Sequence, residues 1–188
     1  MIKDLTIETE RLILRPFKND DYKEWSKGFN DRKASQYKYD EGYDPDSSEY
    51  TKKWFIDWIG EFQEDAEKDE VYILGIFRKE DGVNVGNIEL IKILRMDYNW
   101  GMMGYAIHNQ YFRQGYGKES VQAAVSLFFS ELNFHRIELQ INIDNEPSKK
   151  LAESAGFQYE CARKQFFYEG GKWIDQLIYY KNRENTGG

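Results

Sequence analysis

The segment of residues 100–143 constrains the fold more than any other part of the sequence. Residues 100–108 and 137–143 alternate as strands do, and residues 115–131 between them repeat apolar side chains at the helical period. Because two strands joined through one helix pair in parallel by a crossover connection, this segment predicts one parallel strand pair. The other strands can pair antiparallel, which predicts a mixed sheet in an α+β domain.

The other expected elements follow from apolar periodicity and from turn residues. Ser47 or Ser48 is expected to cap the second helix. In the N-terminal half the elements are a strand over 11–17, a helix from Asp20 or Asp21 to about Asn30, an acidic loop over 37–50, and a helix with Trp54, Trp58 and Phe62 on its apolar stripe. A hairpin of 71–77 and 83–94 around Asp81-Gly82 follows. Near the C-terminus we expect a short helix over 145–155, ended by Gly156, and a final hairpin of 157–168 and 173–180 around Gly170-Gly171.

Length, charge and cysteine content narrow the class of protein. The 188 residues suit one domain, placed at residues 1–182, with residues 183–188 as a polar tail. A net charge of -7 disfavours a phosphate backbone, so nucleic acid is not expected as a partner. The lone cysteine, Cys161, allows no internal disulfide and fits a reducing compartment. Without a signal-peptide pattern or a run of about 18 apolar residues, we expect a cytoplasmic protein that does not span a membrane.

Residues 113–118, Arg-Gln-Gly-Tyr-Gly-Lys, stand between a predicted strand and a predicted helix. The first-turn amides of that helix have no partner within it and carry the positive end of its dipole. Gly115 and Gly117 let the backbone approach a ligand closely, and Arg113 and Lys118 add charge. The pattern predicts a phosphate site, although a tight turn uses glycine for conformational reasons too. No P-loop motif is present, and these glycines come too late in the chain for a dinucleotide fold.

Several stretches together resemble one family over nearly the whole chain and in the same order. They are residues 9–16 (Thr-Glu-Arg-Leu-Ile-Leu-Arg-Pro) with Asp20-Asp21, Gly104-Tyr105 with residues 111–119, Asn145-Glu146-Pro147-Ser148 with Ala155-Gly156-Phe157, and the final hairpin with Asp175. The chain resembles the GNAT superfamily of N-acetyltransferases and is most similar to its RimJ/RimL type, which acetylates protein N-termini. The resemblance implies a mixed, mostly antiparallel sheet of about seven strands whose fourth and fifth strands splay apart, flanked by about four helices.

The resemblance also implies acetyl-CoA as acyl donor, and no metal. Main-chain groups around Tyr105 to His108 would pair with the pantetheine amides like an added strand, and the 113–118 loop would hold the pyrophosphate. Asn145 would bond to the pantetheine and Ser148 would stabilise the departing thiolate, although without the family Asn145 is a good N-cap and Ser148 merely faces that turn. The expected donor-binding residues are Tyr105, Ile107, His108, Arg113, Gln114, Gly115, Tyr116, Gly117, Lys118, Asn145 and Ser148.

The catalytic groups are harder to assign, because the chain departs from the family pattern. Ala152 stands where many relatives carry a tyrosine as general acid, and Met102 and Phe167 stand where others carry acids. Ser148 is therefore the main catalytic candidate. Glu89 is the candidate base, directly or through water, and its alternative is a strand residue that faces solvent. For His108 the alternatives are contact with the acyl donor and plain exposure.

The expected reaction is direct acetyl transfer to a primary amine, best a protein or peptide α-amine. Such an amine, with a pKa near ~8, loses its proton more readily than a lysine-like amine near ~10.4. The alternatives are acetylation of a polyamine, aminoglycoside or amino acid, and a non-catalytic acetyl-CoA-binding protein. Residues 37–58 would line the acceptor side in this family, unless Trp54 and Trp58 belong to the core. A homodimer through exposed aromatic surface stays open.

Overall fold

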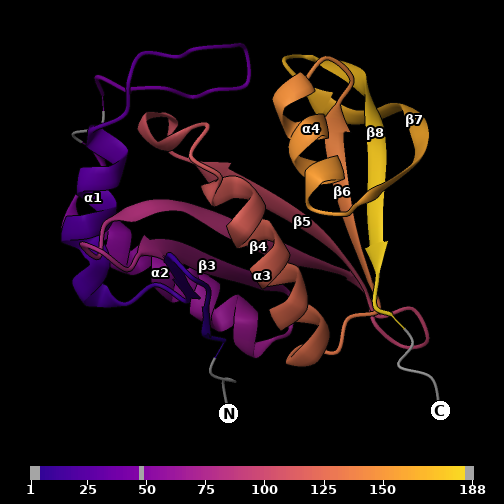
Figure 1. The fold of residues 1–188 in the computed structure, drawn as a ribbon, viewed down its shortest axis with the longest axis horizontal. Coiled ribbons are helices and arrows are strands. Elements are labelled where there is room, and N and C mark those ends of the chain that lie inside the picture. Colours follow the sequence, from indigo (N-terminus) through magenta and orange to yellow (C-terminus); the bar gives the residue numbers. More distant parts are fainter. Residues whose placement is uncertain (1–4, 47–48, 185–188) are drawn as a thin grey trace.

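The computed structural model describes residues 5–46 and 49–184, and its strands form one sheet of eight (Figure 1). The order across the sheet is β1-β2-β3-β4-β5-β6-β8-β7, and only β5 and β6 run parallel. The predicted mixed, mostly antiparallel sheet is therefore confirmed. The strands are β1 (Ile7–Glu8), β2 (Leu12–Arg15), β3 (Val71–Arg78), β4 (Asn84–Leu94), β5 (Trp100–Ile107), β6 (Arg136–Asn142), β7 (Gln158–Glu169) and β8 (Lys172–Asn182).

Helices cover both faces of the sheet. In the described ranges the α-helices are α1 (Tyr22–Asn30), α2 (Lys52–Glu67), α3 (Tyr116–Ser130) and α4 (Glu146–Ser154). Alternate side chains of β3 point to opposite faces: Tyr72, Leu74 and Ile76 join the main core with α3, whereas Ile73 and Phe77 join a second core with α1 and α2. Figure 1 shows α3 lying across the strands. A nearly continuous apolar strand such as β3 is thus buried on both sides.

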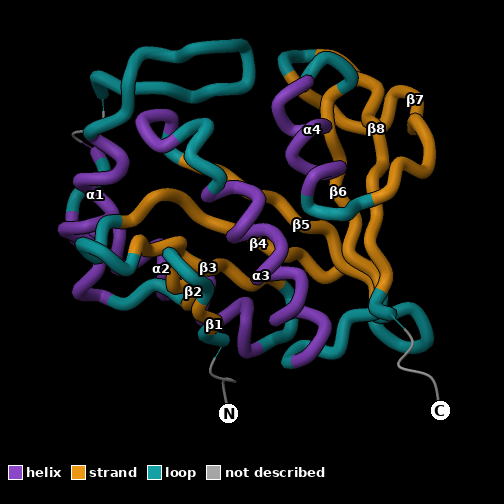
Figure 2. The backbone as a smooth tube through the Cα atoms, viewed as in Figure 1, coloured by secondary structure: helices purple, strands orange, loops and turns teal. Residues whose placement is uncertain are grey.

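The two parallel strands separate soon after they meet. Their pairs run only from Trp100 with Arg136 to Met102 with Glu138. Beyond these pairs β5 continues to Ile107, and Figure 2 shows β5 and β6 leaving one corner of the molecule and diverging. The expected splay of the fourth and fifth strands is therefore present, and it falls at β5 and β6 because the short β1 adds one to the count.

Two local details differ from the sequence-based expectations. About seven strands are expected, but β1 is an additional strand, too short to show an alternating pattern. The cap of α2 is Thr51, whose side-chain oxygen accepts a hydrogen bond from the Trp54 amide at 3.2 Å. The expected caps, Ser47 and Ser48, lie outside the described residues.

The chain continues only briefly beyond β8 in the described part. The Arg183 amide donates to the His135 carbonyl at 2.7 Å, and residues 185–188 of the expected tail lie outside the described ranges. The single-domain boundaries at residues 1 and 182 stay a prediction. Across residues 5–46 and 49–184, the helices are too short or too polar to cross a bilayer.

Candidate active site

A cleft of about 630 Å³ lies beside the C-terminal end of β5, a volume typical of pockets for cofactor-sized ligands. Its walls are β5, the starts of α3 and α4, and the loop of residues 32–42, called the strap below. Of the expected site residues, Gln114, His108 and Glu89 are not among those that line it. The expected residues that do line it are Tyr105, Ile107, Arg113, Gly115, Tyr116, Gly117, Lys118, Asn145 and Ser148.

The start of α3 forms one end of the cleft. Gly115 is the N-cap with a φ of 85°, a left-handed conformation that favours glycine. A side-chain carbon on Gly117 would lie 3.1 Å from Leu151, so the glycine lets α3 and α4 approach closely. Arg113 has a φ of 60° although it carries a side chain. The free first-turn amides, with Arg113 and Lys118 beside them, form a site suited to phosphate oxygens.

Glu119 fixes this end of α3 against the strand β2. Arg11 Nε donates to Glu119 Oε2 at 2.8 Å, and the Thr9 hydroxyl donates to Oε1 at 2.6 Å. Arg11 also donates through Nη1 to the Gln114 carbonyl at 2.9 Å, and the Gln114 side chain donates to the Gln110 carbonyl at 3.3 Å. Thr9 and Arg11 therefore hold the loop before α3 in place, and Gln114 takes part in these contacts rather than lining the cleft.

One edge of β5 is open at the cleft. Its other edge pairs with β4 as far as Gly86 with Ile107, whereas its pairs with β6 end at Met102. Ala106 and Ile107 line the cleft. Main-chain N–H and C=O groups on the open edge are thus available to an extended ligand that adds like a further strand.

Ser148 lies in the first turn of α4 and lines the cleft from the wall opposite β5. Its Oγ is 2.8 Å from the hydroxyl oxygen of Tyr105. The Ser148 amide donates to Asn145 Oδ1 at 3.2 Å, so Asn145 caps α4 as its sequence context indicates. Asn145 lines the cleft as well, and its amide nitrogen retains two N–H donors for a ligand.

Glu89 lies on β4 opposite Gly104 of β5, on the other side of the sheet from Tyr105. Because Gly104 has no side chain, the carboxylate is not covered there: a carbon on Gly104 would lie 3.8 Å from Glu89 Oε2. Glu89 is half-buried, and burial raises the pKa of its carboxyl above the usual 4.5. Within the described residues, desolvation is the only influence found on this carboxyl.

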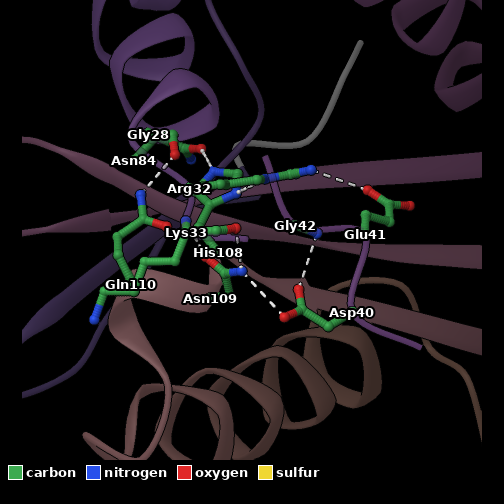
Figure 3. Close-up of polar contacts among 10 residues, drawn as sticks. All are labelled: Gly28, Arg32, Lys33, Asp40, Glu41, Gly42, Asn84, His108, Asn109 and Gln110. Carbon is green, nitrogen blue, oxygen red and sulfur yellow. Dashed lines mark hydrogen bonds and ion pairs between the residues drawn. The ribbon is translucent and has the colours of Figure 1, made fainter. Parts of the chain in front are cut away.

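His108 is buried, with 4% exposure, so the expectation of plain exposure is wrong and its ring does not line the cleft. Its Nδ1 accepts a hydrogen bond from Arg32 Nε at 3.0 Å, and its Nε2 donates to Asn84 Oδ1 at 3.1 Å (Figure 3). The Asn84 amide in turn donates to the carbonyls of Ile76 and Gly86, which leaves its oxygen for the histidine. Burial, with Arg32 beside the ring, lowers the pKa of His108 to about 3. The ring is therefore neutral.

The strap is held to the end of β5 by Asn109. Its Nδ2 donates to Asp40 Oδ2 at 3.0 Å and to the Lys33 carbonyl at 2.8 Å, and its Oδ1 accepts from the Lys33 amide at 2.7 Å (Figure 3). Asp40 also accepts from the Gly42 amide at 3.0 Å. Sequence reasoning missed Asn109 and Asp40, because contacts across some 70 residues leave no local pattern. The acidic composition of residues 37–50, which overlap the strap, was the only signal.

The strap also reaches the opposite wall. Lys38 Nζ donates to Asp144 Oδ2 at 2.9 Å, and the Tyr39 hydroxyl donates to Asp144 Oδ1. Asp144 stands just before α4. The side chains of Lys38 and Asp144 are 67% and 60% exposed, so this bridge contributes little stability.

The acidic and aromatic region 37–58 divides between the cleft and a core. Tyr37 and Tyr39 line the cleft. Trp58 packs against the second core, which confirms the core interpretation for that residue. Trp54 is 36% exposed and stacks on Trp25 and Trp58 with centroid distances of 5.9 and 5.7 Å. Neither Trp54 nor Trp58 lines the cleft.

The positions where the family pattern fails are not equivalent in the structure. Ala152 is fully buried on α4, and Met102 is half-buried. Phe167 is 49% exposed on β7, which β8 separates from β6. Among residues 5–46 and 49–184, no group of three His, Cys, Asp or Glu side chains is arranged as a metal site.

Comparisons with known proteins agree with this geometry. A family model described as "Acetyltransferase (GNAT) domain" matches residues 11–158. The chain is 33% identical over 120 residues to "Probable N-acetyltransferase YjcK" of Bacillus subtilis, a match that covers 64% of this chain and 66% of that protein.

Two solved structures share the fold. One, from Vibrio cholerae and assigned as a ribosomal-protein-serine acetyltransferase, has a TM-score of 0.74 and 25% identity over 97% of this chain and 100% of the other. The other is a chimera of the spermidine N-acetyltransferase SpeG from Vibrio cholerae, with a TM-score of 0.67 and 19% identity over 91% and 95%. The GNAT fold binds acetyl-CoA, and the cleft beside β5 has a volume suited to a cofactor-sized ligand. The chain therefore belongs to the GNAT family and is an N-acetyltransferase.

Proposed function

We propose that the protein acetylates the N-terminal α-amine of a peptide or protein. The observation that carries the proposal is Glu89, a half-buried carboxyl with a raised pKa over Gly104, close to where β5 and β6 part. A carboxylate is a weak base, and an α-amine needs little help. At pH 7 about 10% of amines with a pKa near 8 are neutral, against about 0.04% of lysine-like amines. That ratio of roughly 250 favours the α-amine.

Acetyl-CoA would be held by both walls of the cleft. The first-turn amides of α3, with Arg113 and Lys118, suit its pyrophosphate, and the open edge of β5 suits its pantetheine amides. Asn145 supplies an amide donor from α4. Main-chain amides of β5 would polarise the thioester carbonyl.

The reaction is a direct transfer. The amine nitrogen forms a bond to the acetyl carbon, the carbon–sulfur bond breaks, and its electron pair leaves on sulfur. The proton lost by nitrogen goes to Glu89, directly or through water. Ser148 donates a hydrogen bond to the departing thiolate, which takes a proton from solvent and leaves as the thiol.

The strap suits a cationic acceptor. Tyr37, Tyr39 and Glu41 line the cleft, and the Glu41 side chain is 82% exposed at its rim, where its Oε2 forms an ion pair with Arg32 at 3.1 Å. Carboxylates and aromatic faces attract an ammonium group. A peptide N-terminus meets these requirements, as the protein assigned as a ribosomal-protein-serine acetyltransferase leads one to expect. The same rim fits a polyamine, which makes small amines the competing acceptors.

A matched pair of peptides tests the proposal. One has a free α-amine and acetylated lysine side chains, and the other has an acetylated N-terminus and free lysine side chains. Thiol release from acetyl-CoA is measured with each at pH 7, beside pools of N-terminal peptides, polyamines and aminoglycosides. We expect release with free α-amines. Release with lysine side chains or small amines alone would contradict the proposal, and silence from every pool, with acetyl-CoA binding confirmed, would favour a non-catalytic role.

A further inference from the structure

A polar contact between β5 and α4 crosses the cleft. The side chain of Tyr105 packs against the main core from β5. Its hydroxyl oxygen lies 2.8 Å from Ser148 Oγ and 3.2 Å from the Ser148 carbonyl oxygen, both on α4. Both residues line the cleft. The role expected for Tyr105 concerns its main chain and leaves this hydroxyl unexplained.

The protons available decide what Ser148 can do. Each hydroxyl has a single proton to donate. If Tyr105 donates to the Ser148 carbonyl, the short contact to Oγ requires Ser148 to donate its own proton to Tyr105. If Tyr105 donates to Oγ instead, the proton of Ser148 is free to point into the cleft. The tyrosine hydroxyl thus controls whether Ser148 is a donor to a ligand.

Tyr105 keeps its proton under ordinary conditions. Burial raises the pKa of its hydroxyl to about 12, with the bond to Ser148 acting in the opposite direction. The group is therefore a hydrogen-bond donor throughout the neutral range. It is too weak an acid to give its proton away to a thiolate, so its contribution is orientation.

We propose that Tyr105 is a positioning residue that holds the Ser148 hydroxyl as a donor to the sulfur leaving the thioester. The proposal rests on the role of Ser148 proposed above. As the carbon–sulfur bond breaks and its electron pair moves to sulfur, the Ser148 O–H turns to the sulfur. The Tyr105 O–H turns from the Ser148 carbonyl to Oγ, and neither residue gives up its proton.

The experiment compares Tyr105→Phe, Ser148→Ala and the double variant in single-turnover acetyl transfer. We expect Ser148→Ala to slow transfer by about 10²-fold, as loss of one anion-stabilising donor does. Tyr105→Phe should slow it by about 10-fold, as loss of one hydrogen bond to a reacting group does. The double variant should be no slower than Ser148→Ala, because the tyrosine acts through the serine. The Kd for acetyl-CoA should stay within about twofold in all three.

Tyr179→Phe is the matched control. Tyr179 is a buried tyrosine of β8 whose hydroxyl donates to Glu153 Oε1 of α4 at 3.2 Å, outside the cleft lining. It should keep the parent transfer rate. If Ser148→Ala transfers at the parent rate, the proposed role of Ser148 fails and this inference fails with it. If Ser148→Ala is slow and Tyr105→Phe is not, only the inference fails. Losses that multiply in the double variant, or equal losses in Tyr179→Phe, would make Tyr105 a structural brace and overturn it.

Discussion

The two halves of the molecule, on either side of the parting strands, bury ionisable side chains in opposite ways. The half formed by β1–β5 and α1–α3 buries His108 as a neutral ring between Asn84 and Arg32. The half formed by β6–β8 and α4 buries Glu138, whose side chain is 1% exposed, against Arg163 at 2.9 Å and Arg136 at 3.4 Å. His108 is therefore buried without a charge, whereas Glu138 is buried in ion pairs.

The two halves also differ in how far helices cover the faces of the sheet. The first half has helices on both faces, whereas the outer hairpin β7–β8 of the second exposes large aromatic side chains. These are Tyr159, Phe166, Phe167, Tyr168 and Trp173. Three residue pairs between β5 and β6 and the side-chain bridges of Tyr105 and Asp144 join the halves at the cleft. The main core joins them as well, because it contains side chains of α3 and of β6. The second half is the one we expect to be disrupted first when a single interaction is removed.

Breaking the ion pair in the second half should have the largest effect. Arg163→Met leaves the buried carboxylate with only the longer contact to Arg136, which should cost about 3 kcal/mol in the free energy of unfolding. Urea denaturation measures it. Lys164→Met is the matched control, because the pair of Lys164 with Asp175 lies at the surface and its loss should change little. Equal, small losses in both variants would show that Glu138 does not depend on Arg163.

Glu89 is the ionisable group of the first half that we expect to take part in the chemistry. Glu89→Gln should lower kcat by about 10²-fold, which corresponds to about 2.7 kcal/mol. In the parent protein the rate should fall as the pH drops through the raised pKa of Glu89, because the protonated carboxyl accepts no proton. The variant should lack this limb and keep only the fall in rate that is set by protonation of the amine, whose pKa is near ~8. Glu80→Gln, at an exposed turn residue, is the control, and an unchanged acidic limb in Glu89→Gln would remove Glu89 from the mechanism.

The buried histidine should make the first half sensitive to acid. The pKa of His108 is about 3 in the folded protein and near 6.5 in an unfolded chain, so the unfolded state binds the proton. Stability should therefore be complete above about pH 6.5 and fall between pH 6.5 and 3, by about 2 kcal/mol at pH 5. His108→Gln cannot titrate and should lack this loss in urea titrations at pH 7 and pH 5. The same loss in parent and variant would contradict the neutral, buried ring.

Arg113 should separate ligand binding from stability. Its left-handed backbone costs a residue with a side chain about 1 kcal/mol, so Arg113→Gly should raise the free energy of unfolding by that amount. The same change removes a cation from the cleft and should raise the KM for acetyl-CoA about fivefold, less at high salt. Thermal unfolding checks the expected gain in stability, and initial rates at several acetyl-CoA concentrations check the expected rise in KM. A KM that stays the same would show that Arg113 does not face the phosphates.

The bridge at Asp144 should have the smallest effect. Tyr39 and Lys38 lower the pKa of the Asp144 carboxyl to about 2, so it is charged at neutral pH. Asp144→Asn should weaken the exposed contact and change the KM for the acceptor about twofold, with the melting temperature unchanged. Steady-state rates at several acceptor concentrations measure it. A large loss of stability would mean that the contact of the strap with Asp144, rather than the pairing of β5 with β6, holds the two halves together.

The parts of this structure that follow a local pattern could be predicted from the sequence. The alternation in residues 100–108 and the glycines at 115 and 117 predict β5, the loop and the start of α3, and the resemblance places the splay. The burial of His108 could not be predicted, because its partners Arg32 and Asn84 stand 76 and 24 residues away. The contact of Tyr105 with Ser148 spans 43 residues and depends on how far the strands part. Sequence reasoning selected Glu89 only because Met102 and Phe167 stand where relatives carry acids, so that another carboxylate had to be sought.

The short junction between β5 and β6 makes the ligand itself part of the architecture. Residues of both halves line the cleft, so a molecule that fills it touches both and binds best when they are correctly apposed. A ligand present at 100 times its Kd adds about 2.7 kcal/mol to the free energy of unfolding. Here that energy acts across the joint between the halves. Acyl donor and product should therefore stabilise the contact between the two halves while they are bound. The free energy of unfolding should be lowest after the product has left and before the next acyl donor binds.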